Sequence, residues 1–383
     1  MKQYIPLGEV ITKASVERCG GNQFPILSIT MKDGLVLQDE KFKKRIASVD
    51  TSDYKVIPRG KLVQGIHIDE ANFGIQDIVD AGIVSPAYKV WDVNDRRIFP
   101  KYLEIIMRSP RSIGFYKSKL NGSVNRRGRM TDDDFLGMLI PVVDYSEQIR
   151  IVDILNRVKV VITKREHELS ALDDLIKARF VEMFGDETNP YQWPVVNVED
   201  VANVSVGVVI KPAQYYTDAE HGVKAFRSLN IGAGTIKDSD WVYFSHEGND
   251  KNSKSQLREN DLLIVRSGAP GTACVVPKVY EGCNAIDIII ARPETDKVNP
   301  YYLCTFTNLP HGKRQIDEGT GGAAQQHFNV GKYNKLQLML PPLKQQNEFV
   351  SFLEQIDKSK SVIQKSLDET QLLFDSLMQE YFG

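Results

Sequence analysis

The chain contains little cysteine, with 4 residues in 383. No two of them form a Cys-x-x-Cys pair, and the closest two, Cys274 and Cys283, have no histidine at ligand spacing. This pattern excludes a disulfide framework and a zinc-finger site. We therefore expect free, buried thiols, a reducing cytoplasmic location and no metal bound by this chain.

Long apolar runs and net charge are also lacking. No run reaches the length of a membrane-spanning helix, and the N-terminus, which contains Lys2, Gln3 and Glu9, has no apolar signal core. We expect no contact with a membrane. The formal net charge is only −2, so attraction to a polyanion would depend on local clusters of charge.

Motifs for catalysis are absent as well. The chain has no Gly-x-x-x-x-Gly-Lys-Ser/Thr phosphate loop, no Glu-x-Lys element of metal-dependent nucleases and no metal-spaced pair among its 6 histidines. The Asn-Pro-Tyr sequences at 189–191 and 299–301 are similar to the Asn/Asp-Pro-Pro-Tyr/Phe element of adenine methyltransferases, but both lack the second proline. We predict turns there, no catalytic residue, and no cofactor bound by this chain.

What the chain does contain is a long amphipathic helical pattern that occurs twice. The first copy runs from Glu147 to Gly185 and the second from Gln345 to the C-terminus. Apolar residues recur in alternating steps of four and three, which is typical of a coiled-coil seam. The seam residues are Leu155, Val158, Ile162, Leu169, Leu172, Ile176, Leu353, Ile356, Ile363, Leu367, Phe374 and Leu377. We infer that two helices, each roughly 57 Å long, pack on each other. The alternative is an ordinary pair of core helices.

The repeat extends upstream of the helices. Met138–Pro141 recurs at an offset of 200 as Leu338–Pro341, and the offset falls to 198 within the helices. Pro100 and Pro300 each precede a short helical pattern. Short apolar strand patterns, separated by Gly, Pro and Asn, occupy the rest of both copies. They include Val36–Leu37, Lys61–Val63, Leu262–Val265, Ala273–Val276 and Ile286–Ala291.

These patterns predict an α+β chain in two similar halves. Mixed α/β globular regions are expected at 1–143 and 190–342. The first long helix and a hinge follow at 144–189, and the second long helix at 343–383. The hinge is predicted from the Gly185 stop and the Asn189-Pro190 turn.

The segment from Lys101 to Arg129 is the most basic part of the chain. Eight lysines and arginines against one acid give it a net charge of +7. Lysine and arginine neutralise phosphates, and arginine and asparagine can also read base edges. The DNA-binding candidates in this segment are Lys117, Lys119, Asn121, Ser123, Asn125, Arg126, Arg127 and Arg129. A solvated charged face is the alternative.

The second half carries little charge at the matching place, which is Gly319 to Asn329. Glutamine can read adenine, so we include Gln325, Gln326 and His327 as candidates, against a plain mobile loop as the alternative. Arg266 and Ser267 follow an apolar strand and form a further cluster of potential donors on a loop.

Several of these segments resemble the specificity subunit of type I restriction-modification systems. Asn299, Pro300, Tyr302 and Leu303 are similar to its element before a short helix, and Gly322 and Gln325 to its Gly-then-Gln loop. The Pro-Pro-Leu-x-Gln-Gln run at 341–346 resembles its Pro-Pro-Leu-x-Glu-Gln start of the spacer helix, with Gln345 where Glu is usual. The first half has Pro141, Glu147 and Gln148 at this start, with a connection two residues longer. The resemblance covers the whole chain as two half-units.

The resemblance implies two target-recognition domains separated by two long antiparallel coiled-coil helices, related by a pseudo-two-fold repeat. Each domain would read one half of a bipartite, asymmetric sequence in double-stranded DNA. The helices would set the spacing and dock two methyltransferase subunits. S-adenosylmethionine, ATP and Mg would then be bound by partner subunits, which include restriction subunits that translocate and cleave DNA, and this chain would be non-catalytic.

Two alternatives remain at this point. The chain could be the specificity portion of a related split type II restriction-modification system, which the neighbouring methyltransferase or nuclease genes would distinguish. It could also be a helical scaffold that binds proteins only, and salt-dependent DNA binding would exclude that reading.

Overall fold

The chain forms two compact units that share the two long helices. The computed structural model describes residues 2–42, 47–120, 130–186, 188–320 and 328–383. Unit 1 comprises Met1–His167 with Gln364–Gly383, and unit 2 comprises Glu168–Ile363. Each unit therefore contains one α/β domain, half of α5 (Tyr145–Phe184) and half of α10 (Leu343–Phe382).

The domain of unit 1 is built on an antiparallel sheet in the order β2-β9-β6-β7. Its strands are β2 (Ile11–Lys13), β9 (Lys89–Val93), β6 (Leu62–Gln64) and β7 (Phe73–Ile75). Three antiparallel strand pairs accompany the sheet. They are β1 (Gln3–Pro6) with β10 (Leu139–Val142), β3 (Leu27–Thr30) with β4 (Gly34–Leu37), and β5 (Lys55–Pro58) with β8 (Ala81–Val84).

Three short helices complete this domain before the long helix begins. α2 (Pro100–Met107) and α3 (Pro110–Lys119) both start with proline, whose missing N–H costs nothing at a first helical position. α4 (Asp132–Leu136) starts after Thr131, whose hydroxyl accepts a hydrogen bond from the Asp134 N–H. The remaining short elements are η1 (Leu7–Glu9), α1 (Gln38–Lys41) and η2 (Ile68–Glu70).

Unit 2 repeats this plan with a larger second sheet. Its first sheet has the antiparallel order β12-β19-β16-β17, formed by β12 (Ala202–Val206), β19 (Ile288–Pro293), β16 (Leu262–Val265) and β17 (Ala273–Val275). The second sheet has the order β13-β15-β14-β18, formed by β13 (Tyr216–Thr217), β15 (Val242–Ser245), β14 (Gly222–Phe226) and β18 (Asn284–Ala285). β11 (Val195–Asn197) pairs with β20 (Gln337–Met339), as β1 pairs with β10.

The helices of unit 2 follow the same order as those of unit 1. α7 (Pro300–Asn308), α8 (Pro310–Thr320) and α9 (Val330–Asn334) correspond to α2, α3 and α4. The Asn299 and Asn329 side chains accept hydrogen bonds at the starts of α7 and α9. The other short elements are η3 (Val198–Asp200), η4 (Pro212–Tyr215), η5 (Ser228–Asn230), α6 (His246–Lys251), η6 (Ser253–Ser255) and η7 (Lys278–Tyr280). The structure thus confirms a duplicated mixed α/β fold.

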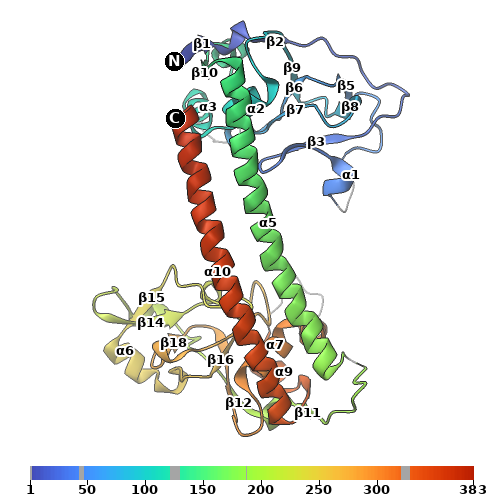
Figure 1. Ribbon diagram of the computed structural model, residues 1–383. Coiled ribbons are helices and arrows are strands. Elements are labelled where there is room, and N and C mark those ends of the chain that lie inside the picture. The colour runs from blue at the N-terminus through green and yellow to red at the C-terminus, as the bar shows by residue number, and fades with distance from the viewer. Residues whose placement is uncertain (1, 43–46, 121–129, 187, 321–327) are drawn as a thin grey trace. The chain divides into compact units, whose positions relative to one another are not determined.

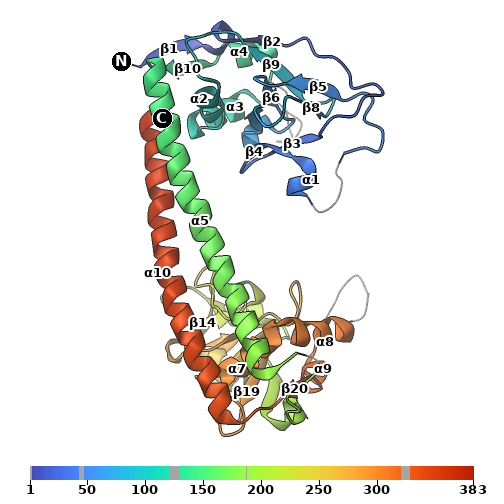
Figure 2. The same cartoon turned by 45° about the vertical axis from the view of Figure 1, so that its right-hand side comes forward.

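The long helices α5 and α10 are continuous and antiparallel within each unit (Figures 1 and 2). In unit 1 the start of α5 shares an apolar core with the end of α10, through Leu155 and Met378. In unit 2 the end of α5 shares a core with the start of α10, where the rings of Phe180 and Phe349 lie 5.4 Å apart. Burial of these apolar faces stabilises the pair more than helix propensity does.

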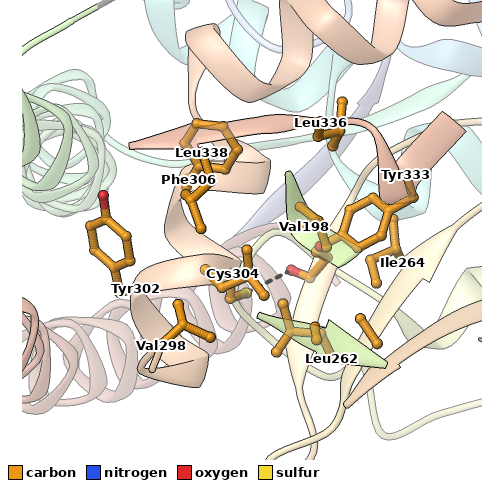
Figure 3. Packing of buried hydrophobic residues seen from close by; sticks show 14 of the residues in the cluster. Val198, Leu262, Ile264, Val298, Tyr302, Cys304, Phe306, Tyr333, Leu336 and Leu338 are labelled. Carbon is orange, nitrogen blue, oxygen red and sulfur yellow. Dashed lines mark hydrogen bonds between the residues drawn. The ribbon is translucent and has the colours of Figure 1, made fainter. Parts of the chain in front are cut away.

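Each unit has a main core in which the first sheet, the short helices and the long helices meet. In unit 2 the core brings Cys304 and Phe306 of α7 together with Leu262 and Ile264 of β16 and Leu338 of β20 (Figure 3). The Tyr302 ring lies on the other side of α7, against Phe180 and Phe184 of α5. The four cysteines are free and buried, as the sequence predicted. No helix among the described residues is long and apolar enough to cross a membrane.

Candidate nucleic-acid interface

The basic segment of unit 1 lies on α2 and α3 and continues beyond α3. Ser109 joins the two helices, and its hydroxyl accepts a hydrogen bond from the Ser112 N–H at the start of α3. The tandem arrangement follows from the Pro100 and Pro110 starts and the Ser109 cap, which favour a break followed by a new helix.

Two cations, one in α2 and one directly after it, form ion pairs and hydrogen bonds within the protein. The Lys101 ammonium lies 2.9 Å from both Asp77 and Glu104. Burial acts to lower the pKa of Lys101, but these two carboxylates outweigh it and raise that pKa. The Arg108 guanidinium lies 3.6 Å from Glu104 and donates to the carbonyl oxygens of Met31 and Lys32, while burial lowers its pKa. These cations hold α2 to the sheet and the β3–β4 turn.

The cations of α3 differ from one another in their surroundings. The Arg111 guanidinium lies 4.6 Å above the Tyr4 ring, and Lys119 forms an ion pair of 3.0 Å with Asp134 in α4. Lys117 is exposed and has no ion pair with any residue that the structure describes. The net charge of +7 therefore overstates the charge offered to a ligand, because acids from elsewhere in the fold neutralise part of it.

The most basic part of the predicted DNA-binding loop lies outside the described residues. This applies to Asn121, Ser123, Asn125, Arg126, Arg127 and Arg129. The described flanks, Leu120 and Met130, both pack against the main core of unit 1. The loop that joins α3 to α4 is therefore anchored at both ends in the same core.

In unit 2 the corresponding segment lies between α8 and α9. The predicted residues Gln325, Gln326 and His327 lie outside the described residues. The next residue, Phe328, is fully buried, and its N–H donates to the carbonyl oxygen of Arg266 at 3.0 Å. The structure thus brings the Arg266 loop to the C-terminal end of the predicted Gln-rich loop, 62 residues away in sequence.

The Arg266 side chain makes hydrogen bonds and an ion pair within unit 2. Its Nε donates to the carbonyl oxygen of Phe328 at 3.2 Å, and its guanidinium forms an ion pair with Asp287. The Arg266 side chain is 12% exposed, and Asp287 has a left-handed φ of 51°. Ser267 is half-buried beside it. This network fixes the backbone at the end of β16, and the sequence offered no signal for the role of Asp287.

The predicted seam residues lie on the less exposed faces of α5 and α10. Leu155, Leu353 and Ile356 are buried, and the other nine are half-buried. Charged side chains also make contacts along the seam. The Lys159 ammonium lies 5.5 Å above the Phe374 ring in unit 1, and Lys360 pairs with Asp173 in unit 2. Burial lowers the pKa of Lys159.

A buried glutamine secures the start of each long helix, and the sequence analysis did not assign it a role. Gln148 and Gln346 are the fourth residues of α5 and α10, and both are fully buried. The Gln148 carbonyl accepts from the Phe99 N–H at 2.8 Å, and its amide donates to Arg97 and Val143 carbonyls at 2.7 Å each. The recurrence of glutamine at an offset of 198 was the available signal.

Gln346 makes the matching set of bonds in unit 2. Its carbonyl accepts from the Asn299 N–H at 2.8 Å, and its amide donates to Pro341 at 2.8 Å and to Lys297 at 3.4 Å. Each glutamine therefore bonds both the connection that precedes its helix and the backbone that precedes the first short helix.

In each unit the first of the three short helices also contacts the end of the long helix that starts in the other unit. The Tyr102 ring of α2 lies 5.4 Å from Phe382, the last residue of α10. The Tyr302 ring of α7 lies 4.9 Å from Phe184, the last residue of α5. The two tyrosine hydroxyls donate to carbonyls of Pro141 and Met339. Each domain therefore holds the start of one helix and the end of the other.

These features define a duplicated protein in which each unit packs an α/β domain against antiparallel halves of α5 and α10. No group of three metal-ligating side chains occurs among the described residues. Comparison with known proteins agrees with this class. Residues 188–370 match the family model described as the Type I restriction modification DNA specificity domain. The type I restriction enzyme EcoBI specificity subunit of Escherichia coli is 20% identical over 190 residues, which are 50% of this chain and 40% of that subunit.

Two solved structures share the fold along the whole chain. The type I restriction-modification system S subunit from M. genitalium aligns with a TM-score of 0.57 at 11% identity, covering 96% of that subunit. A chain described under complex assembly and conformational transition of the type I R-M system aligns with a TM-score of 0.59 at 18% identity, covering 97% of that chain. Residues 188–370 are thus similar to the type I restriction-modification DNA specificity domain, and the chain as a whole shares the fold of these two structures.

Proposed function

We propose that this chain is the specificity subunit of a type I restriction-modification complex and reads a bipartite, asymmetric DNA target. The observation that carries the proposal is the duplication. The two units share the order of sheet, short helices and long helix, but the segments after α3 and α8 differ in charge and in most of their sequence. Two similar frameworks with different loops are suited to read two different half-sites.

The loops after α3 and α8 are the proposed reading elements. The described flanks of these segments, Leu120 and Met130 in unit 1 and Phe328 in unit 2, lie in the main core of their unit. Binding residues lie disproportionately on loops that a rigid scaffold positions. In unit 1 the lysines and arginines would bind phosphates and guanine, and in unit 2 the glutamines would read adenine.

The helix pair is proposed to set the distance between the half-sites. Two-fold readers place their half-site centres about one helical turn, roughly 10 base pairs, apart so that both lie on one face of the DNA. A pseudo-two-fold chain with two reading domains follows the same rule, and it leaves an unread gap between the half-sites.

Partner subunits would supply the catalysis. We propose two methyltransferase subunits that bind S-adenosylmethionine and methylate adenine, and restriction subunits that use ATP and Mg. The absence of catalytic motifs from the sequence supports a non-catalytic role for this chain. Such a complex would act on the cell's DNA in the cytoplasm.

Mapping of methylated adenines across the genome, in a host with and without this gene, tests the proposal. The account predicts one two-part motif with a fixed gap that depends on the gene. A continuous motif, or no gene-dependent methylation in a host that carries the partner subunits, would contradict it.

A further inference from the structure

We infer that Gln148 and Gln346 are positioning residues that fix the angle between each recognition domain and the helix pair, and so keep the recognised gap to a single length. This inference rests on the proposed function, and it attributes the constant length of the gap between the half-sites to two particular side chains. It starts from the matching hydrogen bonds that these glutamines make in the two units.

The helix connections alone leave this angle open. Val143 and Asp144 are the only residues between β10 and α5, so in the absence of other contacts α5 could pivot about a two-residue link. Gln148 lies one turn into the helix and binds the backbone of Arg97 and Phe99, just before α2. This second attachment point lies away from the link and opposes the pivot.

The other contacts at this joint are less directional. The end of α10 contacts the domain through rings, such as Tyr102 with Phe382, and through one exposed hydrogen bond from the Lys2 ammonium to the Glu380 carbonyl. Apolar packing tolerates small sliding movements, and a long lysine side chain can follow them. A hydrogen bond weakens steeply when its angle falls. Three bonds from one amide therefore define the orientation more sharply than the rings do.

The glutamine amide supplies the donors and the acceptor that the hydrogen bonds in both units require. An amide has two donors and one acceptor in this geometry, and all three are used by Gln148 and again by Gln346. Glutamate would keep the acceptor for the Phe99 or Asn299 N–H, but it would turn a carboxylate toward two carbonyl oxygens. The surrounding contacts differ between the units, with a Phe99–Tyr145 ring pair in one and an Asn299–Asn347 hydrogen bond in the other. The glutamine bonds, by contrast, recur in both units.

The consequence for DNA reading concerns distance. A duplex advances about 3.4 Å per base pair, so a small rotation of one domain on the helix pair is enough to bring its reading loop to a neighbouring register. A loosened joint should leave each half-site unchanged and add gaps one base pair shorter or longer.

The test uses the complete complex with Gln148→Glu and, separately, Gln346→Glu, and maps methylated sites in the host. Gln76→Glu is the matched control. Gln76 is also fully buried and makes four bonds, to Ile57, Ile78 and Val79, all inside the domain of unit 1. Gln148→Met and Gln346→Met, which keep a similar length without an amide, serve as second variants if a glutamate variant does not assemble.

We expect the Gln148 and Gln346 variants to methylate sites with neighbouring gap lengths at least about tenfold more often than the wild type, with both half-sites retained. The Gln76 variant should lower the melting temperature and keep a single gap. A single gap in the folded glutamine variants would overturn the inference, as would equal broadening in the Gln76 control. A wild-type host without any two-part site would instead overturn the proposed function, and with it this inference.

Discussion

The ring of Tyr302 in α7 lies 4.9 Å from the ring of Phe184, which is the last residue of α5. Tyr102 and Phe382 repeat this relationship in unit 1. Because Phe184 and Phe382 are almost completely buried, replacing either with alanine should cost about 3–5 kcal/mol of unfolding free energy. Leu372→Ala, at a site that is 68% exposed on α10, is the control and should change little. Urea denaturation of the three variants provides the measurement. Losses below about 1 kcal/mol at both phenylalanines would show that the helix ends are not held in this way.

The different environments of two lysines on α3 predict different effects on DNA binding. Lys117 is exposed, whereas Lys119 is paired with Asp134. Lys117→Ala should weaken binding to all sequences and reduce the slope of log K against log salt by about 0.9, the value for one phosphate contact. Lys119→Ala should change the slope less. Titrations at several salt concentrations measure both, and equal slopes for Lys117→Ala and the wild type would exclude a phosphate contact there.

Buried thiols predict a loss of stability in alkali. Burial raises the pKa of Cys274 to about 12 and that of Cys283 to about 11, compared with about 8.5 in an unfolded chain. In the folded state these thiols keep their protons to a higher pH than in the unfolded chain. Their contribution to the free energy of unfolding is therefore complete below pH ~8.5 and is lost as the pH rises from there to the folded pKa. Cys274→Ala should reduce the slope of unfolding free energy by up to about 1.4 kcal/mol per pH unit above pH ~9. An unchanged slope would mean that this thiol is ionised in the folded protein.

The proposed role of the helices as a ruler can be tested by insertion. Four residues inserted after Ile162 add about one turn, or roughly 6 Å, which corresponds to nearly two base pairs of reach. A coiled coil can absorb this insertion as a local unwinding. The recognised gap should lengthen while both half-sites stay the same.

Two inserted residues are the control for this experiment, because they rotate the following half-helix by about 200° and should abolish assembly. Methylated-site mapping measures both variants. A four-residue variant with full activity and an unchanged gap would show that the helices do not set the spacing.

Local sequence patterns predicted the elements well, because they depend on short-range chemistry. The expected strand Leu262–Val265 coincides with β16, and Pro100 and Pro300 begin α2 and α7 as their fixed φ favours. The first long helix begins at Tyr145, two residues before the predicted Glu147. The repeat offset predicted the duplication, since equivalent residues such as Leu155 and Leu353 have equivalent environments.

Long-range pairing could not be predicted in the same way. The order β2-β9-β6-β7 depends on contacts between strands that lie up to 82 residues apart, which no local pattern encodes. The charge count of the basic segment missed Asp77 and Asp134, because these acids approach Lys101 and Lys119 only in the folded protein. The Arg266–Asp287 pair likewise depends on the pairing of the two central strands, which brings the end of β16 beside the start of β19.

The central claim, that each domain reads one half-site, is tested most directly by exchanging a single domain. Residues 190–340 are replaced with the equivalent region of a relative that recognises a different target, and methylated adenines are mapped in a host that carries the partner subunits. The account predicts that one half-site changes to that of the relative, while the other half-site stays the same. A change in both half-sites, or in neither with the complex active, would contradict it.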